Sequence, residues 1–213
     1  MEFIQFFVLH GDEVLRLTGE HLVLVGLSTG GAVLIGIPLG VGLAHNPGWR
    51  SPVLGLVNVI QTIPSLALFA ILIPLPVIGG IGAGTALIAL VLYSLLPVVS
   101  NTVAGLTGID PAVKEAAVAM GMTNQQLLWR VELPLALGVI VTGVRLATVI
   151  GVGLATIAAA IGAGGLGMFI FRGLAMLDSR LILAGAIPAA AMALAADLIL
   201  SRVEQRFGAR PTA

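Results

Sequence analysis

Long apolar runs alternate with short polar breaks along the whole chain. A helix needs about 20 mostly apolar residues to cross a hydrocarbon core of ~30 Å. Five runs meet that length, at 22–44, 53–75, 82–106, 135–161 and 181–200. The pattern predicts an all-α integral membrane protein with five transmembrane helices. Its expected parts are an N-terminal segment (1–21), a membrane domain (22–206) and a short tail (207–213).

The composition agrees with a membrane protein. Hydrophobic residues make up 58% of the 213 positions and charged residues only 9%, whereas a soluble domain carries roughly 25% charged residues. Lys and Arg together number 10, as do Asp and Glu, so we expect no basic patch and no nucleic-acid partner. The absence of cysteine excludes disulfides, thiolate chemistry and cysteine metal sites.

The longest well-mixed polar segment between apolar runs is 110–134. Asp110 suits a helix N-cap, Pro111 the first helical position, and Gly121 a C-terminal residue with positive φ. Thr123 and Gln126 then have the spacing of a capping box. We therefore expect a helix, a glycine corner, and a second helix that ends at Pro134.

The first of these helices carries a narrow apolar stripe. Val113, Ala117 and Met120 fall at i, i+4 and i+7, beside Lys114 and Glu115. Such a stripe needs a partner that buries it. Spacing alone supports equally well a polar loop that happens to be helical.

Charge bias predicts the orientation. An odd number of spans puts the termini on opposite sides, and cytoplasmic loops are rich in Lys and Arg. With the C-terminus inside, the cytoplasmic parts hold more basic residues than the external ones, namely Arg50, Lys114, Arg130, Arg202, Arg206 and Arg210 against Arg16, Arg172 and Arg180. The N-terminus is then outside and 110–134 is cytoplasmic. The acidic start does not resemble a secretory signal, so we expect an uncleaved N-terminus that is either loosely disordered or anchored at the membrane surface by Phe3, Phe6 and Phe7.

Polar groups and prolines interrupt the apolar spans. Unpaired polar groups are costly in hydrocarbon, so these side chains should face inward, where they serve either as links between helices or as a translocation path. Prolines inside spans leave carbonyls without a partner and predict kinks, as at Pro38, Pro64, Pro97 and Pro188. The candidate path residues are Gln61, Thr62, Pro64, Ser65, Tyr93, Asn101 and Arg145.

Arg145 is the one basic residue well inside a span. It lies about 10 residues into the run 135–161, or ~15 Å along the helix. Its charge must be compensated by Asp197, by water or by extending toward the cytoplasm. A structural ion pair or such an extension is favoured over a direct role in gating or substrate binding.

No constellation for catalysis or cofactor binding is present. The stretch 162–167 matches G-x-G-x-x-G, but it follows an expected spanning helix rather than a strand, so it predicts a sharp external turn instead of a dinucleotide site. The only lysine, Lys114, is followed by Glu115, which excludes a phosphate-binding P-loop. The three histidines have no partner at i+4 and no two carboxylates share a span, so no metal is expected. The sequence therefore favours a transport protein over an enzyme.

The segment 110–134 strongly resembles the EAA signature of ATP-binding-cassette importer permeases. The matching positions are Glu115, Ala116, Ala117, Gly121, Leu133 and Pro134. The resemblance implies the type I importer fold, which is MetI-like, with a cytoplasmic coupling loop that docks into a groove of a separate ATPase subunit. ATP hydrolysis is expected in that subunit and not in this chain.

A finer resemblance comes from 61–67, 143–145 and 161–167, which together are similar to osmoprotectant permeases for glycine betaine, choline or carnitine. It implies a second permease copy or homologue and an extracellular substrate-binding protein. Quaternary ammonium ligands favour aromatic cages, and Trp49, Trp129 and Tyr93 are too few and too scattered to build one here. Alternatives are a methionine or other amino-acid importer of the same architecture, and a free-standing channel or secondary transporter in which Arg145 and Asp197 are the coupling charges.

Overall fold

A computed structural model describes residues 10–76 and 79–207, and Phe3, Phe6, Phe7 and the tail 208–213 lie outside this part. All regular structure in the described part is helical, which confirms the all-α prediction. In chain order the elements are α2 (Gly11–His45), α3 (Pro47–Thr62), α4 (Ser65–Leu72), α5 (Ala83–Thr107), α6 (Pro111–Ala119), α7 (Asn124–Leu127), the π-helix η1 (Leu128–Glu132), α8 (Leu133–Ala158), the 3₁₀-helix η2 (Ala159–Ile161), α9 (Gly167–Met176) and α10 (Ser179–Phe207).

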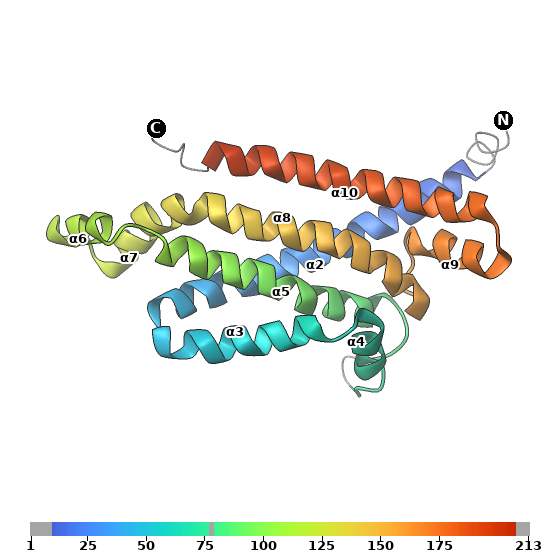
Figure 1. The fold of residues 1–213 in the computed structure, drawn as a ribbon, viewed down its shortest axis with the longest axis horizontal. Helices are drawn as coiled ribbons and strands as arrows, with labels where there is room; N and C mark the ends of the chain where they lie inside the picture. The colour runs from blue at the N-terminus through green and yellow to red at the C-terminus, as the bar shows by residue number, and fades with distance from the viewer. Residues whose placement is uncertain (1–9, 77–78, 208–213) are drawn as a thin grey trace.

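The helices form an elongated bundle with α6 and α7 at one end and α9 at the other (Figure 1). Four stretches of the described chain are long and apolar enough to cross a membrane, and these are Gly11–His45, Ala83–Thr107, Asn124–Ile161 and Ser179–Phe207. α3 and α4 qualify as a fifth only when counted together. The first helix of the described part, α2, begins at Gly11, so residues 11–21 of the expected N-terminal segment continue the first spanning helix.

The predicted run 53–75 is not one straight helix. It begins earlier, at Pro47, and it bends by 100° between α3 and α4. Pro64 has no N–H to continue the helix, and it drives the preceding residue out of the helical region. Ile63 accordingly has extended backbone angles, φ −67° and ψ 128°. The kink expected at Pro64 is confirmed, whereas hydropathy alone predicts one continuous span because the sequence on both sides of the break is apolar.

The bend is tied to the centre of the bundle. The hydroxyl of Tyr93, on α5, donates a hydrogen bond to the carbonyl oxygen of Ile63, which the helix break has left without a partner. On the far side of the break, Leu68, Phe69 and Leu72 of α4 are buried. The α3–α4 bend is therefore a fixed corner with a packed side.

Small residues let α5 lie close to both α2 and α8. A Cβ added to Gly36 would meet the side chain of Val98 at 2.8 Å, and one added to Gly40 would meet Thr102 at 2.6 Å. These two glycines therefore let the backbones of α2 and α5 approach closely. Gly143 of α8 packs as tightly against Pro97, where an added Cβ would lie 2.5 Å from the carbonyl oxygen.

Candidate functional site

The polar segment 110–134 forms the predicted capped helix and glycine corner. The Asp110 carboxylate accepts a hydrogen bond of 2.9 Å from the Ala112 backbone N–H, and Pro111 opens α6. Gly121 ends the helix with φ +83°. The Met122 N–H donates to the Ala117 carbonyl at 3.2 Å and the Gly121 N–H to that of Val118 at 2.9 Å. This is the Schellman pattern, in which a left-handed residue closes the helix.

The second helix starts as predicted but does not end where expected. Thr123 and Gln126 form the capping box, with hydrogen bonds of 2.9 and 3.3 Å in the two directions. The expected stop at Pro134 is wrong, because α7 continues through η1 into α8. In η1 the bonding shifts to the wider π register, with the Leu133 N–H bonded to the Leu128 carbonyl. Pro134, which has no N–H to donate, follows directly in the first turn of α8.

α6 presents exposed apolar side chains at the tip of the bundle. Val113, Val118 and Met120 are 41, 55 and 72% exposed. The predicted stripe is divided, since Ala117 is only 2% exposed and faces the rest of the chain. Glu115 is also exposed and takes part in no ion pair among the described residues.

A buried carboxylate that the sequence reasoning missed lies beneath this helix. The side chain of Glu132, in η1, is only 3% exposed. Its Oε1 lies 2.8 Å from Lys114 Nζ on α6, and its Oε2 lies 3.0 Å from His45 Nε2 at the end of α2. Lys114 Nζ also donates to the Leu106 carbonyl of α5 at 2.9 Å. The available signal was the chain's only lysine, 18 positions before a glutamate in the same polar segment.

The candidate path residues do not all behave alike. On α5, the Asn101 amide donates to the Pro97 carbonyl on its own helix at 2.8 Å, while Tyr93 is bonded to Ile63. Thr62 donates to the Val59 carbonyl at 2.7 Å, at the end of α3. Gln61 and Ser65 are partly buried on either side of the bend, and Pro64, between them, is exposed. These polar groups therefore satisfy local backbone carbonyls or flank the α3–α4 corner.

Arg145 forms the predicted ion pair. Its guanidinium binds Asp197 of α10 through both oxygens, with Nε–Oδ1 at 2.6 Å and Nη2–Oδ2 at 3.0 Å. Its Nη1 donates to Glu204 at 3.0 Å. Glu204 was missed because it lies beyond the predicted span, although it is seven residues after Asp197 and therefore on the same helix face. The three side chains join α8 to α10.

The glycine-rich stretch 162–167 is a turn, as predicted. Gly162, Gly164 and Gly165 have φ of +77, +83 and +74°, respectively. The Gly165 N–H donates to a carboxylate oxygen of Glu20, on α2, at 3.0 Å. No strand precedes the turn in the described chain, so a dinucleotide site has no basis. This turn fastens the start of α9 to α2.

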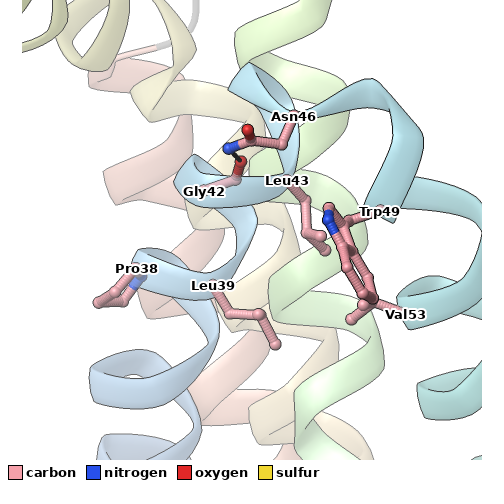
Figure 2. Close-up of a pocket in the computed structure, with 7 residues that line it drawn as sticks. All are labelled: Pro38, Leu39, Gly42, Leu43, Asn46, Trp49 and Val53. Carbon is pink, nitrogen blue, oxygen red and sulfur yellow. Dashed lines mark hydrogen bonds between the residues drawn. The ribbon is translucent and has the colours of Figure 1, made fainter.

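An apolar groove lies between α2 and α3, near the end of the bundle that carries α6. It encloses about 320 Å³ and is lined by Pro38, Leu39, Gly42, Leu43, Asn46, Trp49 and Val53 (Figure 2). The Asn46 amide donates back to the Gly42 carbonyl at 2.8 Å and does not bind into the groove. Trp49 supplies its one aromatic ring, so this groove is no aromatic cage.

Comparison with known proteins identifies relatives along almost the whole chain. Residues 32–210 match the family described as "Binding-protein-dependent transport system inner membrane component". The osmoprotectant import permease protein OsmW of Salmonella typhimurium is 43% identical over 96% of both chains. The choline transport system permease protein OpuBD of Bacillus subtilis is 42% identical over 96% of this chain and 89% of its own. Among solved structures, an inward-facing MetNI methionine ABC transporter chain has a TM-score of 0.83 at 24% identity, covering 92% of this chain and 96% of that one, and at that identity the likeness shows the fold alone.

Proposed function

The chain belongs to the family of inner membrane components of binding-protein-dependent transport systems, and from this premise we propose that it moves a small osmoprotectant across the membrane. It is a permease, a transport component, and its relatives are named for osmoprotectants, choline and carnitine. The proposed solute is therefore a compact quaternary ammonium compound such as glycine betaine, choline or carnitine. The observation that carries the mechanism is the capped helix α6, which presents unpartnered apolar side chains at one end of the bundle.

We infer that α6 is the coupling helix that docks into an ATPase subunit. Val113, Val118 and Met120 supply an apolar surface that a groove would bury, and the exposed Glu115 supplies a carboxylate for its rim. Gly121 sets the angle at which α6 leaves α7. Leu133 and Pro134 lie at the start of α8, so they belong to the connection into the spanning helix. The small side chain of Ala117 lets α6 pack closely where it meets the bundle, and Ala116 is exposed beside Glu115.

ATP hydrolysis is proposed to take place in that partner subunit. The chain has no P-loop, because its one lysine is followed by glutamate, so the energy must come from another protein. We also propose that an external binding protein selects and delivers the solute. Quaternary ammonium groups are bound by several aromatic rings, and the groove beside Trp49 offers only one. The proposed complex contains two permease copies, or this chain and a homologue, with two ATPases.

The charge bias supports the orientation proposed for this complex. The end with α6 carries Arg50, Lys114, Arg130, Arg202 and Arg206, whereas the opposite end, with the glycine-rich turn and α9, carries only Arg16, Arg172 and Arg180 among the described residues. We place the first end in the cytoplasm and the second outside, with the N-terminus outside and the C-terminus inside. The bundle would open alternately to the two sides as the ATPases close and open, a rigid-body type of transition.

We propose that the solute passes along the face of the bundle that includes the α3–α4 bend. Gln61, Thr62, Pro64 and Ser65 cluster at this bend, and Tyr93 binds the carbonyl beneath it. Asn101 lies two turns further along α5. Arg145 is less suited to contact the solute, because its guanidinium is already occupied by two carboxylates, and it acts instead as a tie between α8 and α10.

Solute competition in cells that carry the complete transport system tests this function. Uptake of labelled glycine betaine should be reduced by unlabelled choline or carnitine and unaffected by methionine. Competition by methionine alone would assign the chain to an amino-acid importer of the same fold. Uptake that persisted without the ATPase and followed a proton or sodium gradient would instead indicate a secondary transporter.

A further inference from the structure

Three helices of the bundle meet at a single carboxylate beneath α6. Glu132 lies where α7 passes through η1 into α8, and one of its oxygens faces Lys114 of α6 while the other faces His45 at the end of α2. Lys114 continues the chain of contacts by donating to the last turn of α5 at the Leu106 carbonyl. The carboxylate therefore links α6 to α2 and α8 directly, and to α5 through its partner.

Burial distinguishes this link from the other ion pairs of the chain. Glu132 is 2% exposed, and it is the one buried acidic residue in the part of the chain that the structure describes. The pairs Arg16–Glu20 and Glu13–Arg172 have side chains that are 28 to 62% exposed. Exposed pairs are loose and screened by water, whereas a buried charge must stay paired because it cannot recover its hydration. Glu132 is the buried member of this link, so it must stay paired with Lys114 and His45, whose side chains are 30 and 48% exposed.

The backbone alone offers α6 a weak connection to the spanning helices. At its C-terminal end the chain turns through Gly121, and an added Cβ there would meet nothing within 4 Å, so no neighbouring side chain packs against that glycine. At its N-terminal end a short loop joins α6 to α5 at Gly108–Asp110. A push on α6 that travelled only through these two loops would be absorbed as bending of the loops.

Resting on the function proposed above, we propose that Glu132 is the positioning residue that makes α6, the end of α2 and the start of α8 move as one body. When the ATPase displaces the coupling helix, the Lys114–Glu132 pair carries the displacement into α8, and the Glu132–His45 contact carries it into α2. The π register of η1 places this carboxylate under α6, as π segments often place a functional residue. Without it, the ATPase would still bind α6 and still hydrolyse ATP, but less of that motion would reach the membrane.

The test is the number of solute molecules imported per ATP hydrolysed. The complete complex is reconstituted in proteoliposomes with its ATPase and binding protein, and uptake of labelled glycine betaine and release of phosphate are measured together. Glu132→Gln should retain the ATPase in the purified complex and retain hydrolysis, while uptake per ATP falls at least about fivefold, the lower end of the usual range for coupling between sites. Glu13→Gln, which breaks an ion pair at the opposite end of the bundle, is the matched control and should keep the wild-type ratio.

Two further variants keep the result interpretable. His45→Asn breaks only the contact to α2 and should give a smaller fall in the ratio. Lys114→Met combined with Glu132→Gln removes both charges, so no unpaired ion is left buried, and it should uncouple transport as Glu132→Gln does. An unchanged ratio in Glu132→Gln overturns the proposal, as does a double variant that assembles with a normal ratio or fails to assemble at all. A wild-type complex that imports none of the quaternary ammonium solutes would instead refute the proposed function.

Discussion

The corner at Gly121 gives the sharpest prediction about the coupling segment. Its φ is +83°, a conformation that costs a residue with a Cβ about 1–2 kcal/mol. An added Cβ would meet no atom within 4 Å, so the whole penalty comes from the backbone and none from a clash. At RT of about 0.59 kcal/mol this energy corresponds to a roughly 5- to 30-fold shift in population away from the native corner.

Replacing Gly121 should therefore misdirect α6 without unfolding the bundle. We expect Gly121→Asn to lose the least ATP-driven uptake, Gly121→Ala more, and Gly121→Val the most. The reason is that asparagine tolerates the left-handed region best and a β-branched residue least. Thermal unfolding of the purified permease should change little across the series. Gly48→Ala is the control, since that glycine has open space around it and no positive φ.

The assay is uptake into proteoliposomes, together with the amount of ATPase that co-purifies with the permease. Loss of uptake with a normal unfolding temperature is the expected result for the valine variant. Normal uptake in Gly121→Val, with normal assembly, would show that the left-handed corner does not set the angle of α6 and would refute this reasoning.

Three other predictions concern the bundle itself. Gly143→Ala forces a Cβ to within 2.5 Å of the Pro97 carbonyl oxygen, and overpacking of this kind should cost about 1–3 kcal/mol, seen as a lower unfolding temperature in detergent. Tyr93→Phe removes the hydrogen bond to the Ile63 carbonyl, and it should cost about 0.5–1.5 kcal/mol and speed amide exchange around the α3–α4 bend. The pKa of Asp178, in the turn before α10, is lowered by the hydrogen bond from the backbone N–H of Arg180 and by the side chain of the same arginine. Because this pKa is lower in the folded state, the carboxylate stabilises the fold above the unfolded pKa of about 3.9, and the stabilisation is lost as pH falls through the folded pKa. Asp178→Asn should therefore make thermal stability less sensitive to acid.

Features set by neighbouring residues could be predicted from the sequence. The Asp110 cap, the corner at Gly121 and the capping box of Thr123 and Gln126 depend on a few adjacent positions, and all three are present. The Arg145–Asp197 pair could also be predicted, although the residues are 52 positions apart, because a charge in an apolar span has very few possible partners.

Features that depend on register or on distant contacts could not be predicted. The π segment before Pro134 changes which carbonyl each N–H meets, and no composition signal marks such a shift. In the sequence, nothing marks Glu132 as buried. Its contact with His45, 87 positions away, exists only because the fold places the two residues together. The same holds for Glu20, whose bond to Gly165 spans 145 positions. These contacts follow from how the helices pack, which the apolar pattern leaves open.

In the proposed mechanism, an ATPase that acts on α6 drives this permease. The most direct measurement is uptake of labelled glycine betaine into proteoliposomes that contain the complete complex, with the binding protein outside and ATP or a non-hydrolysable analogue enclosed with the ATPase. We predict uptake that requires both hydrolysable ATP and the binding protein. Equal uptake with the analogue, or uptake by the permease alone in response to an ion gradient, would contradict the account.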